Sequence, residues 1–166
     1  TTEQTKDSRS SLLYLQSLNI SYKLSMKIYK LYGEDTIDII KLNPYKLVDD
    51  ISGVGFTMAD NIARNMQINS NSAFRISAGI SHILNYESEL NGHTTIKKDF
   101  LINKVSKLLK VNTIEVSDQI KKDSITGKLY IVEIKDEEFV YKKSLYKAEK
   151  YIAMTLKQKK DSQYIF

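Results

Sequence analysis

Residues 47–60 read LVDDISGVGFTMAD, and this segment indicates how the first part of the chain folds. The glycines Gly53 and Gly55 permit the backbone angles with which one helix turns back on the next within a few residues. Val54 lies between them and can pack in the seam of the two helices, while Ala59 lets the helices approach closely. We therefore predict a tight hairpin of two helices around the glycines.

The same hairpin predicts a site for an anion. Thr57 and Asp60 have the spacing of a capping box, which predicts a helix that starts at Thr57. The first turn of such a helix leaves backbone N–H groups free, and the helix dipole adds partial positive charge. In this geometry the anion is typically a nucleic-acid phosphate, so the pattern is that of a helix-hairpin-helix that holds DNA backbone without reading bases. The candidate DNA contacts are Gly53, Val54, Gly55, Phe56 and Thr57.

A second copy of this layout lies about 34 residues earlier, in Leu15-x-x-Leu18-Asn19-Ile20-Ser21. Asn19 and Ser21 stand where the glycines would be. Asn tolerates the left-handed backbone region and Ser caps helices, so both replacements suit a hairpin. We predict a tandem helix-hairpin-helix domain over residues 8–70, with Asn19, Ile20 and Ser21 as further candidate DNA contacts.

The alternative is that both hairpins are only compact turns in a helical bundle. Asp49 and Asp50 lie beside the glycine hairpin, and acidic neighbours lower the affinity for phosphate. After this hairpin no Lys or Arg follows before Arg64. The residues alone leave both alternatives open, DNA contact by at least one hairpin and helix packing without DNA.

Other signals place the remaining short helices of this region. Ser21 and Asp35 can each cap a helix, and Gly33 can end one. Asn43-Pro44 predicts a helix with Pro at its first position, running to about Asp50. Residues 67–73 are polar and form a plausible junction.

Beyond the junction, three apolar periodic segments precede two β-type runs. Ile76 to Leu84, Leu101 to Leu109 and, more weakly, Ile114 to Lys122 predict helices. Residues 129–134 and 139–141 predict a β-hairpin around a turn at Asp136-Glu137. Three helices followed by a hairpin are the order of a winged helix. The predicted fold is mainly α: the tandem helix-hairpin-helix bundle, a winged-helix-like domain over residues 73–143, and a C-terminal helix over residues 144–160.

The net positive charge is confined to the second half of the chain. Residues 1–72 have no net charge, and residues 73–166 carry the whole excess of +5, which indicates a nucleic-acid face or a solvated lysine-rich surface. Arg64 and Arg75 can either meet phosphate or bind carboxylates and carbonyls of neighbouring segments. The candidate charge contacts to DNA are Lys104, Lys107, Lys110, Lys121, Lys122 and Lys128.

Composition excludes several classes of function. There is no cysteine and there are only two histidines, His82 and His93, so disulfides, thiolate metal sites and histidine-rich sites are excluded. No Walker loop for ATP and no apolar run of about 18 residues is present. We expect no catalytic residue, metal or cofactor within these residues, no membrane contact, and a cytoplasmic location.

An ordered set of short motifs runs through nearly the whole chain. The set comprises Asn43-Pro44-Tyr45, Ser52-Gly53-Val54-Gly55-Phe56, Ala59-Asp60, Arg75-Ile76, Ala78-Gly79-Ile80, Gly92-His93-Thr94 and Tyr146-x-Ala148-Glu149. Over roughly residues 12–160 this order resembles the region upstream of the motor in RecD-like DNA helicases of the second subclass. These proteins resemble the exodeoxyribonuclease V alpha chain but occur without its partner subunits.

The resemblance implies an accessory region of a bacterial ATP-dependent 5′-to-3′ DNA helicase of superfamily 1, acting in repair or recombination. It implies ATP and Mg²⁺ for the motor of the parent protein, whose ATP-binding loop lies beyond this chain. The implied partners are single-stranded or forked DNA, the chain's own motor domain and a repair protein. The alternative function is a structural or protein-docking module that positions the motor without touching DNA. A stand-alone winged-helix regulator is disfavoured, because Glu115 and Asp118 open the candidate recognition helix.

Overall fold

The computed structural model describes residues 2–92 and 95–143. The chain falls into two compact units, Thr1–Ala78 and Gly79–Phe166, and the boundary lies within one helix, α6 (Ala73–Glu89). The domain bounds inferred from the sequence, 8–70 and 73–143, remain predictions. The expected helix over residues 144–160 lies outside the described residues, as do His93 and the motif around Tyr146.

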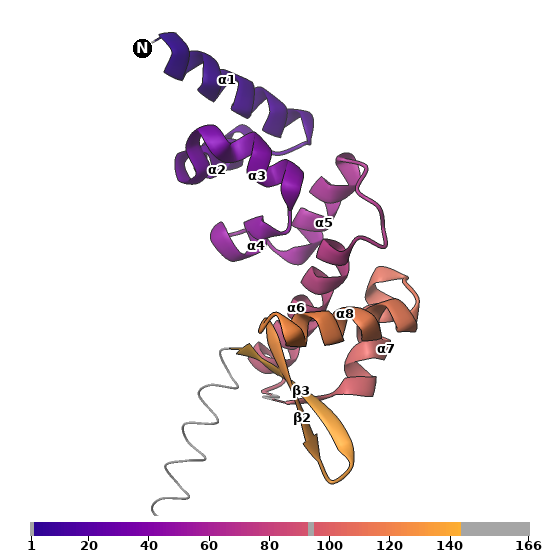
Figure 1. The fold of residues 1–166 in the computed structure, drawn as a ribbon. Helices are drawn as coiled ribbons and strands as arrows, with labels where there is room; N and C mark the ends of the chain where they lie inside the picture. Colours follow the sequence, from indigo (N-terminus) through magenta and orange to yellow (C-terminus); the bar gives the residue numbers. More distant parts are fainter. Residues whose placement is uncertain (1, 93–94, 144–166) are drawn as a thin grey trace, which may run out of the picture. The chain divides into compact units, whose positions relative to one another are not determined.

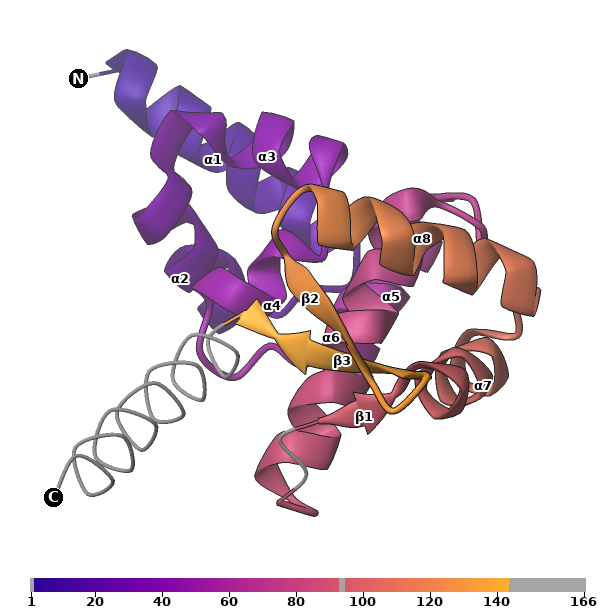
Figure 2. The ribbon, with the colours of Figure 1, turned by 60° about the horizontal axis from the view of Figure 1, so that its bottom comes forward.

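The first unit is built from short helices. In order they are α1 (Thr2–Ser17), α2 (Tyr22–Tyr32), the 3₁₀ turn η1 (Gly33–Asp35), α3 (Thr36–Leu42), α4 (Lys46–Asp50) and α5 (Phe56–Asn65). Helices α1, α2 and α3 pack against one another, and α4 packs against α5 (Figures 1 and 2). The fully buried apolar side chains of this core are Leu15, Ile28, Ile40, Leu47 and Ala59.

Two of the predicted helix ends are confirmed. The Ser21 hydroxyl accepts a hydrogen bond from the Leu24 N–H at 3.2 Å and so caps α2. Gly33 ends α2 with a positive φ of 60°, a backbone conformation that glycine adopts readily.

Two predicted helix starts are wrong in detail. Helix α4 begins at Lys46, so Pro44 is not its first residue; the Asn43 side chain accepts from the Tyr45 N–H at 3.0 Å and holds a separate turn before the helix. Asp35 precedes α3, but its side chain makes no capping bond. The 3₁₀ turn runs directly into α3, and there the Thr36 hydroxyl donates to the Gly33 carbonyl at 2.6 Å.

The second unit has the winged-helix order. After the end of α6 come β1 (Ile96–Lys97), α7 (Lys98–Leu109), α8 (Thr113–Ile125), β2 (Leu129–Ile134) and β3 (Glu137–Lys142). The strands form an antiparallel sheet in the order β1-β3-β2, and the sheet contacts α7 and α8. The mainly helical fold with a small β unit is therefore confirmed, and β1 is an addition to it.

The hairpin turn lies one residue earlier than predicted. Lys135 and Asp136 form it, with φ angles of 52° and 65°, while Glu137 already pairs with Ile134 in the ladder. Two consecutive left-handed residues match the right-handed twist of the strands, which is why such two-residue turns join hairpins.

Candidate nucleic-acid interface

The two hairpins share the backbone conformation at two corresponding positions. Asn19 and Gly53 each have a positive φ, 64° and 92°. Two residues later, Ser21 and Gly55 are extended and occupy the N-cap of the following helix, α2 or α5. The first hairpin therefore reproduces these two positions without glycine, although the helix before the second hairpin ends differently, at an extended Ile51.

A pair of backbone bonds explains how an asparagine serves in the first hairpin. The Ile20 N–H donates to the Leu15 carbonyl at 3.3 Å, and the Asn19 N–H donates to the Gln16 carbonyl at 3.0 Å. These bonds form a Schellman motif, which ends a helix with one left-handed residue. Ile20 is 5% exposed and packs into the core, as Val54 does in the glycine hairpin.

Helix α5 does not start with a capping box. It begins at Phe56 with Gly55 as its N-cap, and no side chain caps it. The Asp60 carboxylate is directed instead to Tyr45 and Arg75. The first bond within the helix runs from the Ala59 N–H to the Gly55 carbonyl at 3.1 Å, so the amides of Thr57 and Met58 precede the bonded part of the helix.

The candidate contacts of the glycine hairpin divide into two groups. Gly53, Gly55 and Thr57 are exposed. Val54 and Phe56 are buried, and the Phe56 ring stacks on that of Tyr45 with 6.0 Å between centroids. The two buried side chains hold the hairpin in shape, which leaves the exposed backbone as the surface that a ligand can reach.

The charges beside the glycine hairpin offset one another. Asp50 accepts a hydrogen bond from the Tyr32 hydroxyl at 2.7 Å and lies 3.7 Å from the Lys46 amine. Lys27, on α2, donates to the Ser52 carbonyl at 2.8 Å. Lys27 is 25 positions from Ser52 in the sequence, so the residues next to the hairpin give no sign of this contact. With Asp49 also exposed, two acids and two lysines surround this turn.

A groove lies beside the first hairpin. Its volume is about 510 Å³, and it runs between the start of α2 and one face of α5. The residues that line it are Leu18, Asn19, Ile20, Ser21, Leu24, Met58, Asn61, Ile62, Arg64 and Asn65. No carboxylate is among them, and Arg64 is the charged residue of the set. The Asn65 side chain donates to the Leu18 carbonyl at 2.9 Å, which ties α5 to this hairpin.

A known protein family matches the part of the chain that contains both hairpins. The family described as the ATP-dependent RecD2 DNA helicase HHH domain matches residues 4–95, more than half of the chain. The chain belongs to this family. The matched residues include α1 from residue 4 onward, all of α2 to α6 and every candidate contact in the two hairpins, which confirms the resemblance to RecD-like helicases.

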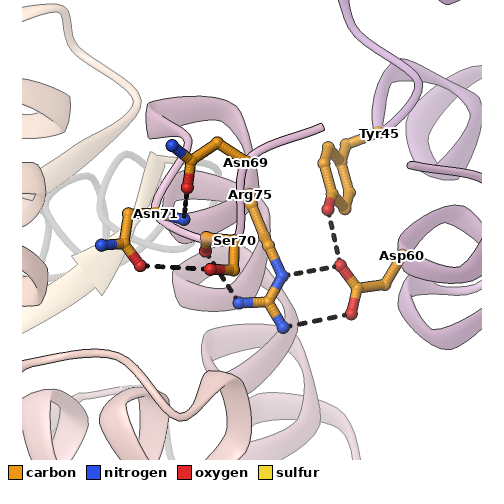
Figure 3. A network of polar contacts seen from close by, with 6 residues as sticks. All are labelled: Tyr45, Asp60, Asn69, Ser70, Asn71 and Arg75. Carbon is orange, nitrogen blue, oxygen red and sulfur yellow. Dashed lines mark hydrogen bonds and ion pairs between the residues drawn. The ribbon is translucent and has the colours of Figure 1, made fainter. Parts of the chain in front are cut away.

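In this RecD2 HHH domain, Arg75 has a structural role. Its guanidinium contacts both oxygens of Asp60, at 2.9 and 3.3 Å, and donates to the Ser70 carbonyl at 2.9 Å (Figure 3). The Tyr45 hydroxyl donates to the same carboxylate. The Arg75 and Asp60 side chains are 12% and 13% exposed. Of the two alternatives for Arg75, the structure favours the bonds to carboxylate and carbonyl.

Burial and the Asp60 carboxylate together raise the pKa of the Tyr45 phenol. Burial is the larger cause, and the hydrogen bond to Asp60 adds to it. The pKa of Tyr32 is raised in the same way, by burial first and then by Asp50. Both phenols therefore stay protonated donors at physiological pH.

The six lysines proposed as charge contacts are all exposed and belong to the second unit. Lys104 and Lys107 lie on α7, Lys110 follows it in the left-handed conformation, Lys121 and Lys122 lie on α8, and Lys128 precedes β2. Lys104 stands over the Phe100 ring at 5.4 Å. They are therefore spread over α7, α8 and the segments that follow these helices.

The positions with which winged helices commonly read DNA are acidic in this chain. Asp118 is exposed in the first half of α8, and the wing carries Glu137 and Glu138. Glu137 lies 3.3 Å from Lys97, and Glu138 lies 2.8 Å from Lys98, which ties the wing to β1 and the start of α7. The carboxylates at these positions oppose a phosphate backbone, whereas the exposed Lys121 and Lys122 lie in the second half of α8.

The described part of the chain offers neither a membrane-spanning helix nor a metal site. Its helices include none that is long and apolar enough to cross a membrane. Residues 2–92 and 95–143 also contain no group of three or more His, Asp or Glu side chains positioned to hold a metal ion.

Proposed function

We propose that this chain is the DNA-binding accessory region of an ATP-dependent RecD2 helicase, and that its hairpins hold the nucleic-acid backbone without reading sequence. The observation that carries this proposal is the conformation that the two hairpins share at two positions, where Asn19 and Ser21 match Gly53 and Gly55. Each hairpin presents the start of a helix, where amides and the helix dipole favour an anion.

The proposed binding is weak and depends on salt. A few phosphate contacts give an affinity on the order of 10⁻⁴ to 10⁻⁶ M at physiological salt, with no preference among sequences. The catalytic work, with ATP and Mg²⁺, belongs to the motor of the parent protein, which acts 5′ to 3′ in cytoplasmic DNA repair or recombination. These residues themselves are not an enzyme in this proposal.

A second candidate function is the docking of a protein. It is favoured by the acidic wing, where Asp136, Glu137 and Glu138 are all exposed. A basic surface, either of the motor domain or of a repair protein, fits this charge better than DNA does. The two candidates are compatible, since the hairpins and the wing belong to different units.

The test is a salt titration of binding to labelled single-stranded, duplex and forked DNA. We expect log K to fall with log[salt] at a slope of about −2 to −4, as for two to four neutralised phosphates. The form of DNA that binds most tightly then shows where the region acts on a fork. If no binding occurs at about 50 mM salt, where screening is weak, the hairpins are structural and the docking function takes precedence.

A further inference from the structure

We propose that the hairpin without glycines is the principal DNA contact, and that its groove holds one phosphate of a nucleic-acid strand with Arg64 as the cation. This inference rests on the proposed function and deepens it, because it assigns the binding to one of two hairpins. It also reverses the order that the sequence indicates, in which the glycine hairpin is the better copy.

The chemistry of the groove suits a phosphate. Besides Arg64, its polar lining consists of the hydroxyl of Ser21 and the carboxamides of Asn19, Asn61 and Asn65. A guanidinium binds phosphate through two parallel N–H donors, which fixes the position of the anion as well as its charge. No lining side chain carries a negative charge that would oppose it.

The groove has a fixed frame. Asn65 holds the Leu18 carbonyl at 2.9 Å, so α5 and the first hairpin are joined directly beside Arg64. At its other side α2 begins, where the Ser25 N–H is bonded to the Ser21 carbonyl at 2.8 Å. The amides before that bond lie in the first turn of an 11-residue helix, so the helix dipole adds to the field of Arg64.

The size and walls of the groove indicate more than a bare ion. Its volume of about 510 Å³ exceeds what a single phosphate needs, and Met58 and Leu24 add apolar surface. A phosphate with its adjoining sugar matches this mixture of polar and apolar walls. The occupant is therefore a segment of nucleic-acid backbone rather than free inorganic phosphate.

The glycine hairpin is electrostatically poorer. Asp49 and Asp50 are exposed beside it, and Lys46 is paired with Asp50. Lys27 is a further cation at this turn, and its amine is bonded to the Ser52 carbonyl. A phosphate at this turn would face two carboxylates, whereas a phosphate in the groove would face Arg64 with no acid in the lining.

The experiment compares matched variants of the 166-residue chain by fluorescence anisotropy with labelled single-stranded and forked DNA. R64Q removes the cation of the groove, and K27Q removes the cation of the glycine hairpin. We expect R64Q to weaken binding about tenfold and to lower the salt slope by about one, while K27Q changes binding by less than about twofold. R64K, which keeps the charge without the planar fork, should fall between R64Q and the unmodified chain.

A second pair tests the site without removing a cation. N61D places a carboxylate in the groove, and S52D places one at the glycine hairpin, both at exposed positions. We expect N61D to weaken binding more than S52D. The inference is overturned if S52D and K27Q weaken binding as much as N61D and R64Q do. If the unmodified chain does not bind DNA, the proposed function itself is overturned. This outcome differs from the one that overturns only the assignment of binding to the groove. Thermal melting of each variant checks that the fold is retained.

Discussion

Asn19 and Gly53, 34 positions apart, place a left-handed residue at the same point of two successive helical hairpins, with φ angles of 64° and 92°. The side chain of asparagine makes this conformation tolerable, because its short polar group interacts locally with the backbone. The turn therefore requires a positive φ at this position, and the residue type determines how much conformational free energy that φ costs.

The first prediction concerns Asn19. A β-branched residue is least tolerant of a positive φ, so Asn19→Val should destabilise the first unit by about 1–2 kcal/mol. Asn19→Gly should be neutral or slightly stabilising. The midpoint of urea unfolding, followed by circular dichroism, measures both. Equal midpoints for the two variants would show that the angle is not under strain.

The second prediction concerns the ion pair of Asp60 and Arg75. Asp60→Asn leaves a largely buried guanidinium without its carboxylate and should lower the free energy of unfolding by about 3 kcal/mol. The control is Glu137→Gln, which removes an exposed pair with Lys97 and should cost less than about 0.5 kcal/mol. Both values come from urea unfolding, and a small effect at Asp60 would contradict the structural role of the pair.

The third prediction concerns alkaline pH. Burial and Asp60 raise the pKa of Tyr45 above the ordinary value of a tyrosine, about 10, so the protonated phenol stabilises the folded state. That contribution is complete below about pH 10 and is lost as the pH rises toward the folded pKa. Thermal melting from about pH 8 to 11 should show this decline. Tyr45→Phe should reduce the slope, and adding Tyr32→Phe should reduce it further, because the pKa of Tyr32 is also raised.

The fourth prediction concerns Gly79, on α6. A Cβ at this position would lie 2.7 Å from Leu109 Cδ1, so Gly79→Ala should destabilise the second unit by about 1–3 kcal/mol. Shortening the opposing side chain with Leu109→Val should recover part of the loss. Gly55→Ala is the comparison, since a Cβ there meets open space and the φ of −96° is ordinary, so its cost is limited to the exchange of one N-cap residue for a poorer one. Thermal melting of the three variants tests this packing.

Apolar periodicity predicted the helices of the second unit, because each buries one face against its neighbours, whereas the short helices of the first unit also needed capping residues, Gly and Pro. Strand β1 was missed because a strand of two residues, Ile96 and Lys97, is too short to show an alternating pattern. The capping box at Thr57 was wrong because Asp60 finds stronger partners in Tyr45 and Arg75, which are remote from it in sequence. Local spacing cannot show a competition with tertiary contacts.

The candidate site was predictable only in part, because some of its features are local in the sequence and others depend on tertiary contacts. The hairpin turns depend on neighbouring residues, and the pattern of Asn19, Ser21 and the glycines was enough to find both. The groove brings the start of α2 together with Arg64 on α5, and only the folded chain shows that these segments meet. Lys27 beside Ser52 is another pairing of this kind.

The polar segment between α5 and α6 has the composition of a flexible linker, yet side-chain bonds connect the two helices that it joins. Arg75 on the first turn of α6 holds Asp60 on α5 with two parallel bonds and holds the Ser70 carbonyl with a third. A force applied to the start of α6 therefore acts on α5 directly through these bonds, without first extending the segment between the two helices. Tension on that helix would reach the helix that forms one wall of the groove.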